Sequence, residues 1–131
     1  MTGVLVDTSV WIEHFRHRSG SLTALLETDQ ALTHPMVWVE LACGTPPEPR
    51  ARTLQDLRVL QQTQQASLAE VMDFIEREKL YGLGCGLVDI VLLASTLMTP
   101  QARLWTLDKR LAALSERFGV MHQPAHQPAR H

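Results

Sequence analysis

The stretch VLVDTSVW, residues 4–11, joins a short apolar run to an acidic residue and then to a helix-like pattern. The β-branched and leucine side chains at its start are typical of a buried strand, which we expect to end at Asp7. Thr8 or Ser9 can then cap a helix, because a hydroxyl oxygen accepts a hydrogen bond from an unpaired backbone N–H of the first turn. A buried strand that leads directly into a helix is the repeating unit of α/β folds.

The rest of the chain repeats this alternation. Further strands are predicted at residues 31–34 and 103–107, and a last short one at residues 120–121. Helical patterns with start or stop signals lie at residues 21–26, 35–44, 54–60, 67–75, 88–98 and 109–118. Alternating strands and helices predict a single α/β domain, with a central, largely parallel sheet that helices cover on both faces.

The clearest helix start is SLAE at residues 67–70. It is a capping-box pattern, in which a serine and a glutamate three residues later bond to each other's backbone N–H groups. Leu68, Val71, Met72 and Ile75 recur at helical spacing, so we expect them to share the face that is turned to the core.

Length and composition fit one compact domain. The chain has 131 residues, of which 45% are hydrophobic and 20% charged, and its formal net charge is −2. This charge argues against a protein that coats nucleic acid non-specifically, although a local basic face is compatible with a nuclease. The apolar stretches are too short for a membrane span and no basic segment precedes residue 4, so we expect a cytoplasmic protein. We assign residues 1–121 to the domain and expect residues 122–131, with two prolines and no apolar period, to form a mobile tail.

Four acidic residues stand in apolar or strand-end surroundings, where carboxylates are rare because a lone charge is costly to bury. They are Asp7, Glu40, Asp89 and Asp108. Taken singly, Asp7 and Asp108 can cap helices, and Asp89 can lie where the helix macrodipole favours an anion. Taken together, Asp7 and Asp108 each follow a predicted strand and Asp89 opens an apolar helix. Such positions converge at one edge of a parallel sheet.

Carboxylates gathered at one edge repel one another and raise one another's pKa values. A divalent cation reverses this balance, and ligand sets made only of oxygen favour hard ions, so Mg²⁺ or Mn²⁺ is the expected cofactor. Such a site can support phosphoryl transfer, because the ion activates water and stabilises charge on the phosphate. A Mg²⁺-dependent phosphatase with an aspartate nucleophile is disfavoured, because Ser9 stands where those enzymes usually carry a second aspartate, two residues after Asp7.

Four segments around these acids resemble, in order, the acid motifs of the PIN-domain family. They are VDTSVW (residues 6–11), VELACG (39–44), GLVDIVLLAS (86–95) and LWTLDKRL (104–111). The resemblance extends from about residue 3 to residue 121. In size the chain is similar to bacterial VapC toxins, the ribonuclease halves of VapBC toxin–antitoxin pairs.

This resemblance implies a sequence-selective endoribonuclease that is the toxin of a type II toxin–antitoxin pair. It implies hydrolysis of RNA by a water that Mg²⁺ or Mn²⁺ activates, and a homodimer that a small VapB-type antitoxin holds inactive. By the same resemblance, Asp7 and Asp89 are the surest metal ligands. Glu40 and Asp108 complete the catalytic acidic pocket, directly or through water.

Hydroxyl groups beside the acids are expected to steady them. The resemblance points to Thr8, Ser9 and Thr106, which would hold the carboxylates or the attacking water through hydrogen bonds. Helix capping accounts equally well for Thr8 and Ser9. Phosphate contacts are expected from basic side chains, although a solvated surface accounts for any one of them as well. The candidates are Arg16, His17, Arg18, Arg50, Arg52, Arg103, Lys109 and Arg110.

A non-catalytic PIN module that regulates transcription through a DNA-binding antitoxin is the alternative hypothesis. Such a module would not need all four acids. Metal-dependent cleavage of RNA by the isolated chain separates the two hypotheses.

Overall fold

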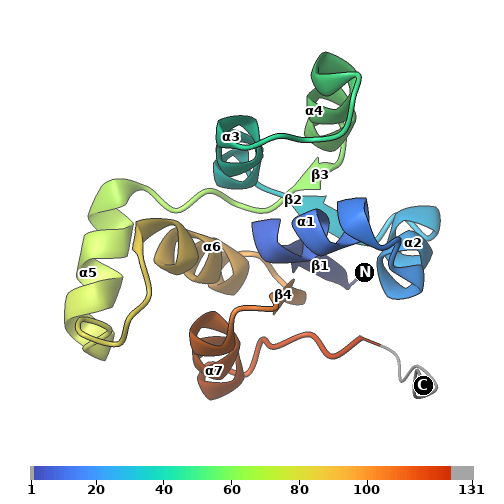
Figure 1. The fold of residues 1–131 in the computed structure, drawn as a ribbon. Coiled ribbons are helices and arrows are strands. Elements are labelled where there is room, and N and C mark those ends of the chain that lie inside the picture. Colours follow the sequence, from blue (N-terminus) through green and yellow to red (C-terminus); the bar gives the residue numbers. More distant parts are fainter. Residues whose placement is uncertain (1, 125–131) are drawn as a thin grey trace.

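The computed structural model describes residues 2–124, which fold into strands and helices in regular alternation (Figure 1). Their order is β1 (Gly3–Val6), α1 (Thr8–Arg16), α2 (Gly20–Glu27), β2 (Ala31–Thr33), α3 (Pro35–Cys43), α4 (Arg50–Arg58), β3 (Gln61–Gln62), α5 (Leu68–Glu78), α6 (Leu87–Met98), β4 (Ala102–Trp105) and α7 (Lys109–Arg117).

The strands form one parallel sheet in the order β3-β2-β1-β4. In the register, Val4 of β1 lies beside Ala31 of β2 on one side and Arg103 of β4 on the other. Helices lie on both sides of this sheet (Figure 1). The predicted α/β architecture, with a parallel sheet between helices, is therefore confirmed.

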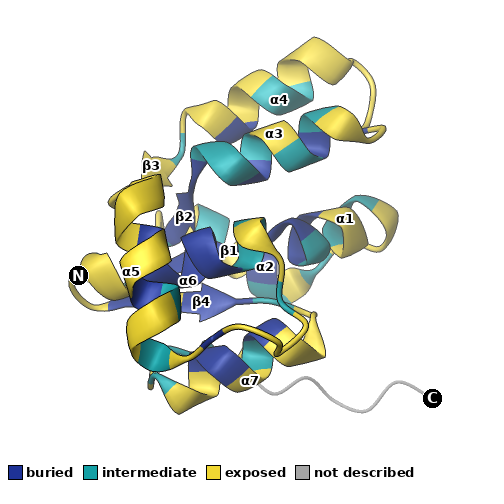
Figure 2. Cartoon of the chain, turned by 90° about the vertical axis from the view of Figure 1, so that its left-hand side faces the viewer, coloured by how far each residue is buried: buried dark blue, intermediate teal, exposed yellow. Residues whose placement is uncertain are grey.

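The core lies between the central strands and α6. Leu5 and Val6 of β1, Leu92 and Leu93 of α6, and Leu104 of β4 are completely buried. Figure 2 shows this buried centre and the more exposed outer surfaces of α4 and α5. The chain carries its acids on or directly beside these rigid, buried elements, which fixes their positions.

Several predicted boundaries need correction. Asp7 itself caps α1, so the helix begins at Thr8, and neither Thr8 nor Ser9 is the cap. The strands at 31–34 and 103–107 are shorter than expected and end at residues 33 and 105, because the next residues already lead into helices. Strand β3 was not predicted from its two glutamines, since its backbone pairing with β2 comes from the tertiary fold.

The capping box before α5 is confirmed, but the predicted face of that helix is wrong in part. Val71 and Phe74 are buried, whereas the exposed fractions of Leu68 and Met72 are 67% and 65%. The buried stripe of α5 is therefore rotated from the one that the apolar spacing indicated, and two large apolar side chains are left on the surface.

The end of the described chain remains attached to the sheet. Instead of a regular strand at residues 120–121, Met121 makes a single parallel bridge to Leu104. The backbone N–H of His122 donates to the Leu104 carbonyl at 2.9 Å, and its ring packs on Trp105. The remainder of the predicted tail, residues 125–131, lies outside the described residues. No described helix combines the length and apolar character needed to cross a bilayer.

Candidate functional site

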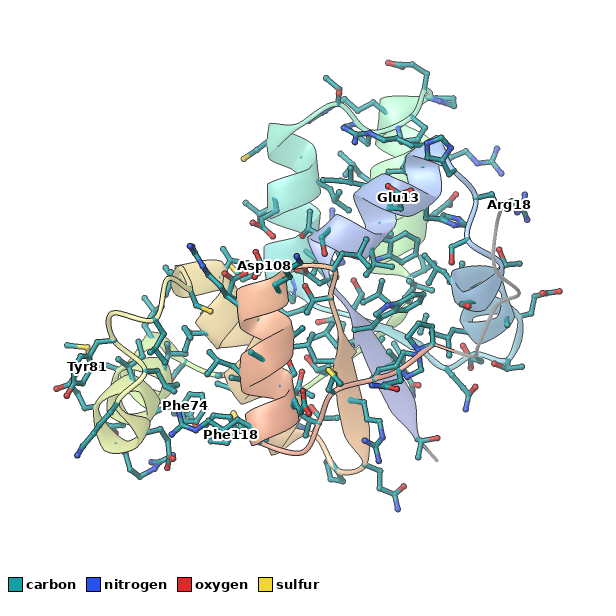
Figure 3. The ribbon with its side chains drawn as sticks, turned by 60° about the horizontal axis from the view of Figure 1, so that its bottom comes forward. Glu13, Arg18, Phe74, Tyr81, Asp108 and Phe118 are labelled. Atoms are coloured by element: carbon teal, nitrogen blue, oxygen red, sulfur yellow. The ribbon has the colours of Figure 1, made fainter. Side chains whose placement is uncertain are left out.

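Two of the four acids lie at the carboxyl ends of neighbouring parallel strands. Asp7 directly follows β1 and caps α1, while Asp108 follows β4 and caps α7. The Asp7 backbone N–H donates to the Trp105 carbonyl at 2.9 Å, and Leu107 N–H donates to Ser9 Oγ at 3.0 Å. Figure 3 shows Asp108 at the start of α7, and these bonds place it next to the start of α1. Parallel pairing of β1 with β4 therefore brings two distant acids to one edge.

The Asp7 carboxylate is almost fully buried and firmly oriented. Its exposed fraction is 5%, and its Oδ2 atom accepts from Ser9 Oγ and from Thr106 Oγ1, each at 2.7 Å. The Ser9 backbone N–H adds a longer contact of 3.4 Å. Thr106 Oγ1 in turn accepts from the Asp108 backbone N–H at 3.0 Å. One threonine hydroxyl therefore connects both strand-end acids.

Glu40 reaches the site from α3. Its Oε1 atom accepts a 2.6 Å hydrogen bond from the Thr8 hydroxyl in the first turn of α1. Burial raises the pKa of Glu40, and the charges on Asp7 and Asp89 raise it further, whereas the hydrogen bond from Thr8 lowers it. Thr8 therefore stabilises the ionised form of a carboxylate that its neighbours disfavour.

Asp89 reaches the site from the first turn of α6. Its Oδ2 atom accepts from the Gly86 backbone N–H at 3.2 Å, which fixes the carboxylate at the helix start. Burial is the largest cause that raises the pKa of Asp89. The charges on Asp7 and Asp108 also raise it, and the Gly86 hydrogen bond acts in the opposite direction.

The raised pKa values of Glu40 and Asp89 indicate that these two carboxylates lie near other acids of the site. Glu40 responds to Asp7 and Asp89, and Asp89 responds to Asp7 and Asp108. Like charges raise one another's pKa values only over short distances in partly desolvated surroundings. Within residues 2–124, however, no three acidic, histidine or cysteine side chains are close enough to form a ready-made metal-binding group. The acids are gathered, but their arrangement is more open than a closed ligand cage.

The four carboxylates share one bonding pattern. Each uses one oxygen for the hydrogen bonds that hold it, and over the described part of the chain its second oxygen accepts none. The unused atoms are Asp7 Oδ1, Glu40 Oε2, Asp89 Oδ1 and Asp108 Oδ2. None of the four carboxylates forms an ion pair with a described lysine, arginine or histidine. Oriented acidic oxygens without a counter-charge suit a hard divalent cation, so the donor set fits Mg²⁺ or Mn²⁺.

The structure thus brings together all seven residues that the sequence singled out. Asp7, Glu40, Asp89 and Asp108 surround one edge of the sheet, while Thr8, Ser9 and Thr106 donate hydrogen bonds to two of them. The capping role considered for the two strand-end acids is confirmed, because Asp7 and Asp108 cap helices with one oxygen each. Their service as metal ligands and catalytic groups stays a prediction.

His34 is a supporting residue that the sequence reasoning missed. It caps α3, with Nδ1 accepting from Met36 N–H at 3.0 Å, and its Nε2 lies 3.1 Å from Ser95 Oγ of α6. It therefore joins the helix that carries Glu40 to the helix that carries Asp89. Its position directly before Pro35, at a helix start, is the signal that would have marked it.

Two hollows lie beside α1, and one of them borders the site. The first, of about 480 Å³, includes Glu40 in its wall and is otherwise lined mainly by apolar side chains and a proline-rich loop. The second, of about 540 Å³, shares Phe15 and Pro47 with the first and is also lined by Trp11. The Nε1 atom of Trp11 is the one buried side-chain nitrogen or oxygen in the described chain that lacks a hydrogen-bond partner.

Comparison with known proteins gives a consistent match. Residues 4–117 match the PIN domain family. The chain is 44% identical over 117 residues to Ribonuclease VapC32 of Mycobacterium tuberculosis, from strain CDC 1551 / Oshkosh and from strain ATCC 25618 / H37Rv. Each alignment covers 89% of this chain and 94% of the relative.

Proposed function

Because this chain belongs to the PIN-domain family, we propose that it is an endoribonuclease that hydrolyses RNA with Mg²⁺ or Mn²⁺ and acts as the toxin of a toxin–antitoxin pair. The 44% identity to proteins named Ribonuclease VapC32 supports this choice of activity. The proposal includes a VapB-type antitoxin as partner, a homodimer as the assembly and the cytoplasm as the location.

The observation that carries the proposal is the set of four unused carboxylate oxygens. Four acids from four separate segments are oriented by hydrogen bonds on one oxygen, which leaves the other oxygen available. A purely structural carboxylate would gain most from an ion pair or from bonds to both oxygens, and none of the four has a described basic partner. We assign Asp7 and Asp89 as the main metal ligands, with Glu40 and Asp108 completing the set.

In the proposed reaction, the oxygen of a water molecule attacks phosphorus, the bond from phosphorus to the leaving sugar oxygen breaks, and that oxygen takes up a proton from solvent. A bound Mg²⁺ or Mn²⁺ supplies a Lewis acid that activates the water and stabilises negative charge on the phosphate. We assign Glu40 Oε2 the role of taking up a proton from the attacking water, because Thr8 holds the other oxygen of that carboxylate. Ser9 and Thr106 keep Asp7 in one orientation, so the site needs little reorganisation.

The two hollows beside α1 offer a binding site for the proposed antitoxin. Glu40 is part of one wall, so a segment that fills this hollow would also obstruct the acids. The proposed homodimer is supported by the exposed side chains of Leu68 and Met72 on α5 and of Leu97 and Met98 on α6.

Cleavage of a mixed RNA pool by purified, antitoxin-free protein tests the proposal. The reactions contain Mg²⁺, Mn²⁺ or EDTA, and Asp89→Asn protein prepared in parallel reveals contaminating nuclease. We expect discrete products that require the metal and are absent with Asp89→Asn. Folded wild-type protein that gives no products with either metal would overturn the enzymatic proposal and favour a regulatory module.

A further inference from the structure

Arg110 lies beside the acidic site on the first turn of α7. Its backbone N–H donates to Asp108 Oδ1 at 2.9 Å, which ties the residue to one of the four acids. Its guanidinium Nη1 contacts the Gly84 carbonyl at 3.4 Å, in the loop that leads to Asp89. The side chain therefore spans from the Asp108 end of the site to the loop before Asp89.

Gly84 provides the room for this side chain. A Cβ atom at this position would lie 2.9 Å from Cδ, Nε and Nη1 of Arg110, which is closer than real contacts of this kind. Gly84 also has a φ of +87°, a conformation that side chains rarely adopt. The Arg110 side chain therefore lies against the backbone of the loop at Gly84. Any side chain at residue 84 would displace the Arg110 guanidinium.

The charge of Arg110 remains available. Across the described residues, its guanidinium forms no ion pair, and the Gly84 carbonyl is its single hydrogen-bond acceptor. The pKa of the Cys85 thiol depends on the charges around it. Burial and then the charges of Asp89 and Asp108 raise the pKa of Cys85, while Arg110 lowers it. A cation with several unused N–H donors therefore lies near the same thiol as Asp89 and Asp108, and no described carboxylate pairs with it.

We propose that Arg110 binds a phosphate of the RNA strand next to the phosphate that is cleaved, and so positions the substrate. The inference rests on the proposed ribonuclease function. An RNA strand that enters this site brings phosphates towards four carboxylates, and a cation at the edge offsets part of that repulsion. A guanidinium suits this task because its planar fork can donate two parallel hydrogen bonds to one phosphate.

Three other arginines already have partners in the described chain. Arg50 donates to the Ala42 and Gly44 carbonyls, and Arg77 and Arg117 pair with Glu78. Arg103 is exposed like Arg110, but it lies within β4 beside Val4, before the strand reaches the acidic edge. Arg103 is therefore a matched control, with the same charge and exposure at a different place.

Binding of RNA to a protein that cannot cleave it tests the proposal. Asp89→Asn serves as the parent, and Arg110→Gln, Arg110→Lys and Arg103→Gln are each added to it. Fluorescence anisotropy with a labelled pool of random single-stranded RNA oligonucleotides gives Kd over a series of salt concentrations.

We expect Arg110→Gln to weaken binding about tenfold at low salt, as for one charged hydrogen-bonding contact. It should also reduce the slope of log K against log salt by about 0.7, the value for one phosphate contact to a single strand. Arg110→Lys should keep the slope and lose part of the affinity.

Three results would each count against a phosphate contact by Arg110. Equal Kd and equal salt slope in Arg110→Gln and the parent would overturn the proposal. A lower melting temperature with an unchanged salt slope would also overturn it, because this is the result for a residue that only supports the glycine loop. An equal loss in Arg103→Gln would show a diffuse charge effect and would overturn the assigned position. Failure of the proposed function is distinct, because it appears as absence of cleavage by the protein with its natural Asp89.

Discussion

The Thr8 hydroxyl donates a 2.6 Å hydrogen bond to Glu40 Oε1 and so joins the start of α1 to α3 across 32 residues of sequence. This bond lowers the pKa of Glu40, against the effects of burial and of two neighbouring carboxylates. It also leaves Oε2 as the oxygen that is available to a ligand. The orientation of the Glu40 carboxylate therefore depends on a residue on another helix.

Replacing Thr8 by valine removes this bond with little change in volume. We expect Thr8→Val to raise the pKa of Glu40 and to weaken Mg²⁺ or Mn²⁺ binding about tenfold, a loss typical for partners of metal-binding side chains. Titration calorimetry with Mn²⁺ measures the affinity, and cleavage of RNA follows in parallel. Thr8→Ser keeps the hydroxyl and should retain most of the affinity. Wild-type affinity in Thr8→Val would show that Glu40 does not depend on this contact.

The Thr106 hydroxyl makes two hydrogen bonds at the site. It donates to the Asp7 carboxylate and accepts from the Asp108 backbone N–H. Thr106→Val leaves the buried Asp7 carboxylate with Ser9 as its remaining side-chain donor. We expect the free energy of unfolding to fall by about 1–2 kcal/mol, since a hydrogen bond to a charged group is lost. Denaturant unfolding in EDTA measures this change without metal. Thr106→Ser, which keeps the hydroxyl, is the control and should retain most of the stability. An unchanged free energy of unfolding in Thr106→Val would contradict a contribution from this hydrogen bond.

Asp89→Asn should separate stability from activity. The pKa of Asp89 is raised by burial and by the charges on Asp7 and Asp108, so its ionised form destabilises the metal-free fold. The amide oxygen of asparagine can still accept from Gly86 N–H. We therefore expect a higher melting temperature in EDTA, by about 2–4 °C, together with loss of cleavage. Added Mg²⁺ should raise the melting temperature of the wild type more than that of the variant. A variant that melts lower than wild type in EDTA contradicts the repulsion argument.

The positions of Asp7 and Asp108 could be predicted from the sequence because both follow readable strands. Parallel strands end at the same edge, so the strand order alone brings their carboxyl ends together. The same reasoning gave the single α/β domain and the helix start at residue 67. In each case the signal is local, in the form of an apolar run, a cap or a break, and the geometry of a parallel sheet supplies the rest.

Contacts that depend on how the helices pack could not be predicted from the sequence. Neither the Thr8–Glu40 bond nor the approach of Arg110 to Gly84 follows from spacing, since each joins segments whose distance is set by the complete fold. The face of α5 shows the same limit. Apolar spacing indicates a stripe on a helix, but the neighbouring α6 determines which part of it is covered, and Leu68 and Met72 are left exposed.

His34 provides the last prediction, which concerns acid pH. Burial lowers the pKa of His34 below the ordinary value of 6.5, and its Nδ1 can accept from Met36 N–H only while that nitrogen is unprotonated. As the pH falls below 6.5, the unfolded chain takes up a proton that the folded chain resists. His34 therefore contributes stability that is present above pH 6.5 and is lost as the pH falls through its folded pKa.

His34→Asn isolates this contribution, because asparagine is a good helix cap that does not titrate. Other groups also make stability depend on pH. The raised pKa values of Glu40 and Asp89 favour the folded state as the pH falls. The lowered pKa values of His14 and His122 disfavour it, as that of His34 does. The informative quantity is therefore the difference between wild type and variant at each pH, measured by urea unfolding in EDTA. We expect this difference to shrink as the pH is lowered from 7 towards 5, because only the wild type loses the contribution of a neutral His34. A difference that stays constant over this range would contradict the prediction. His34 would then stabilise the fold through packing and its Ser95 contact, and its protonation would make no contribution.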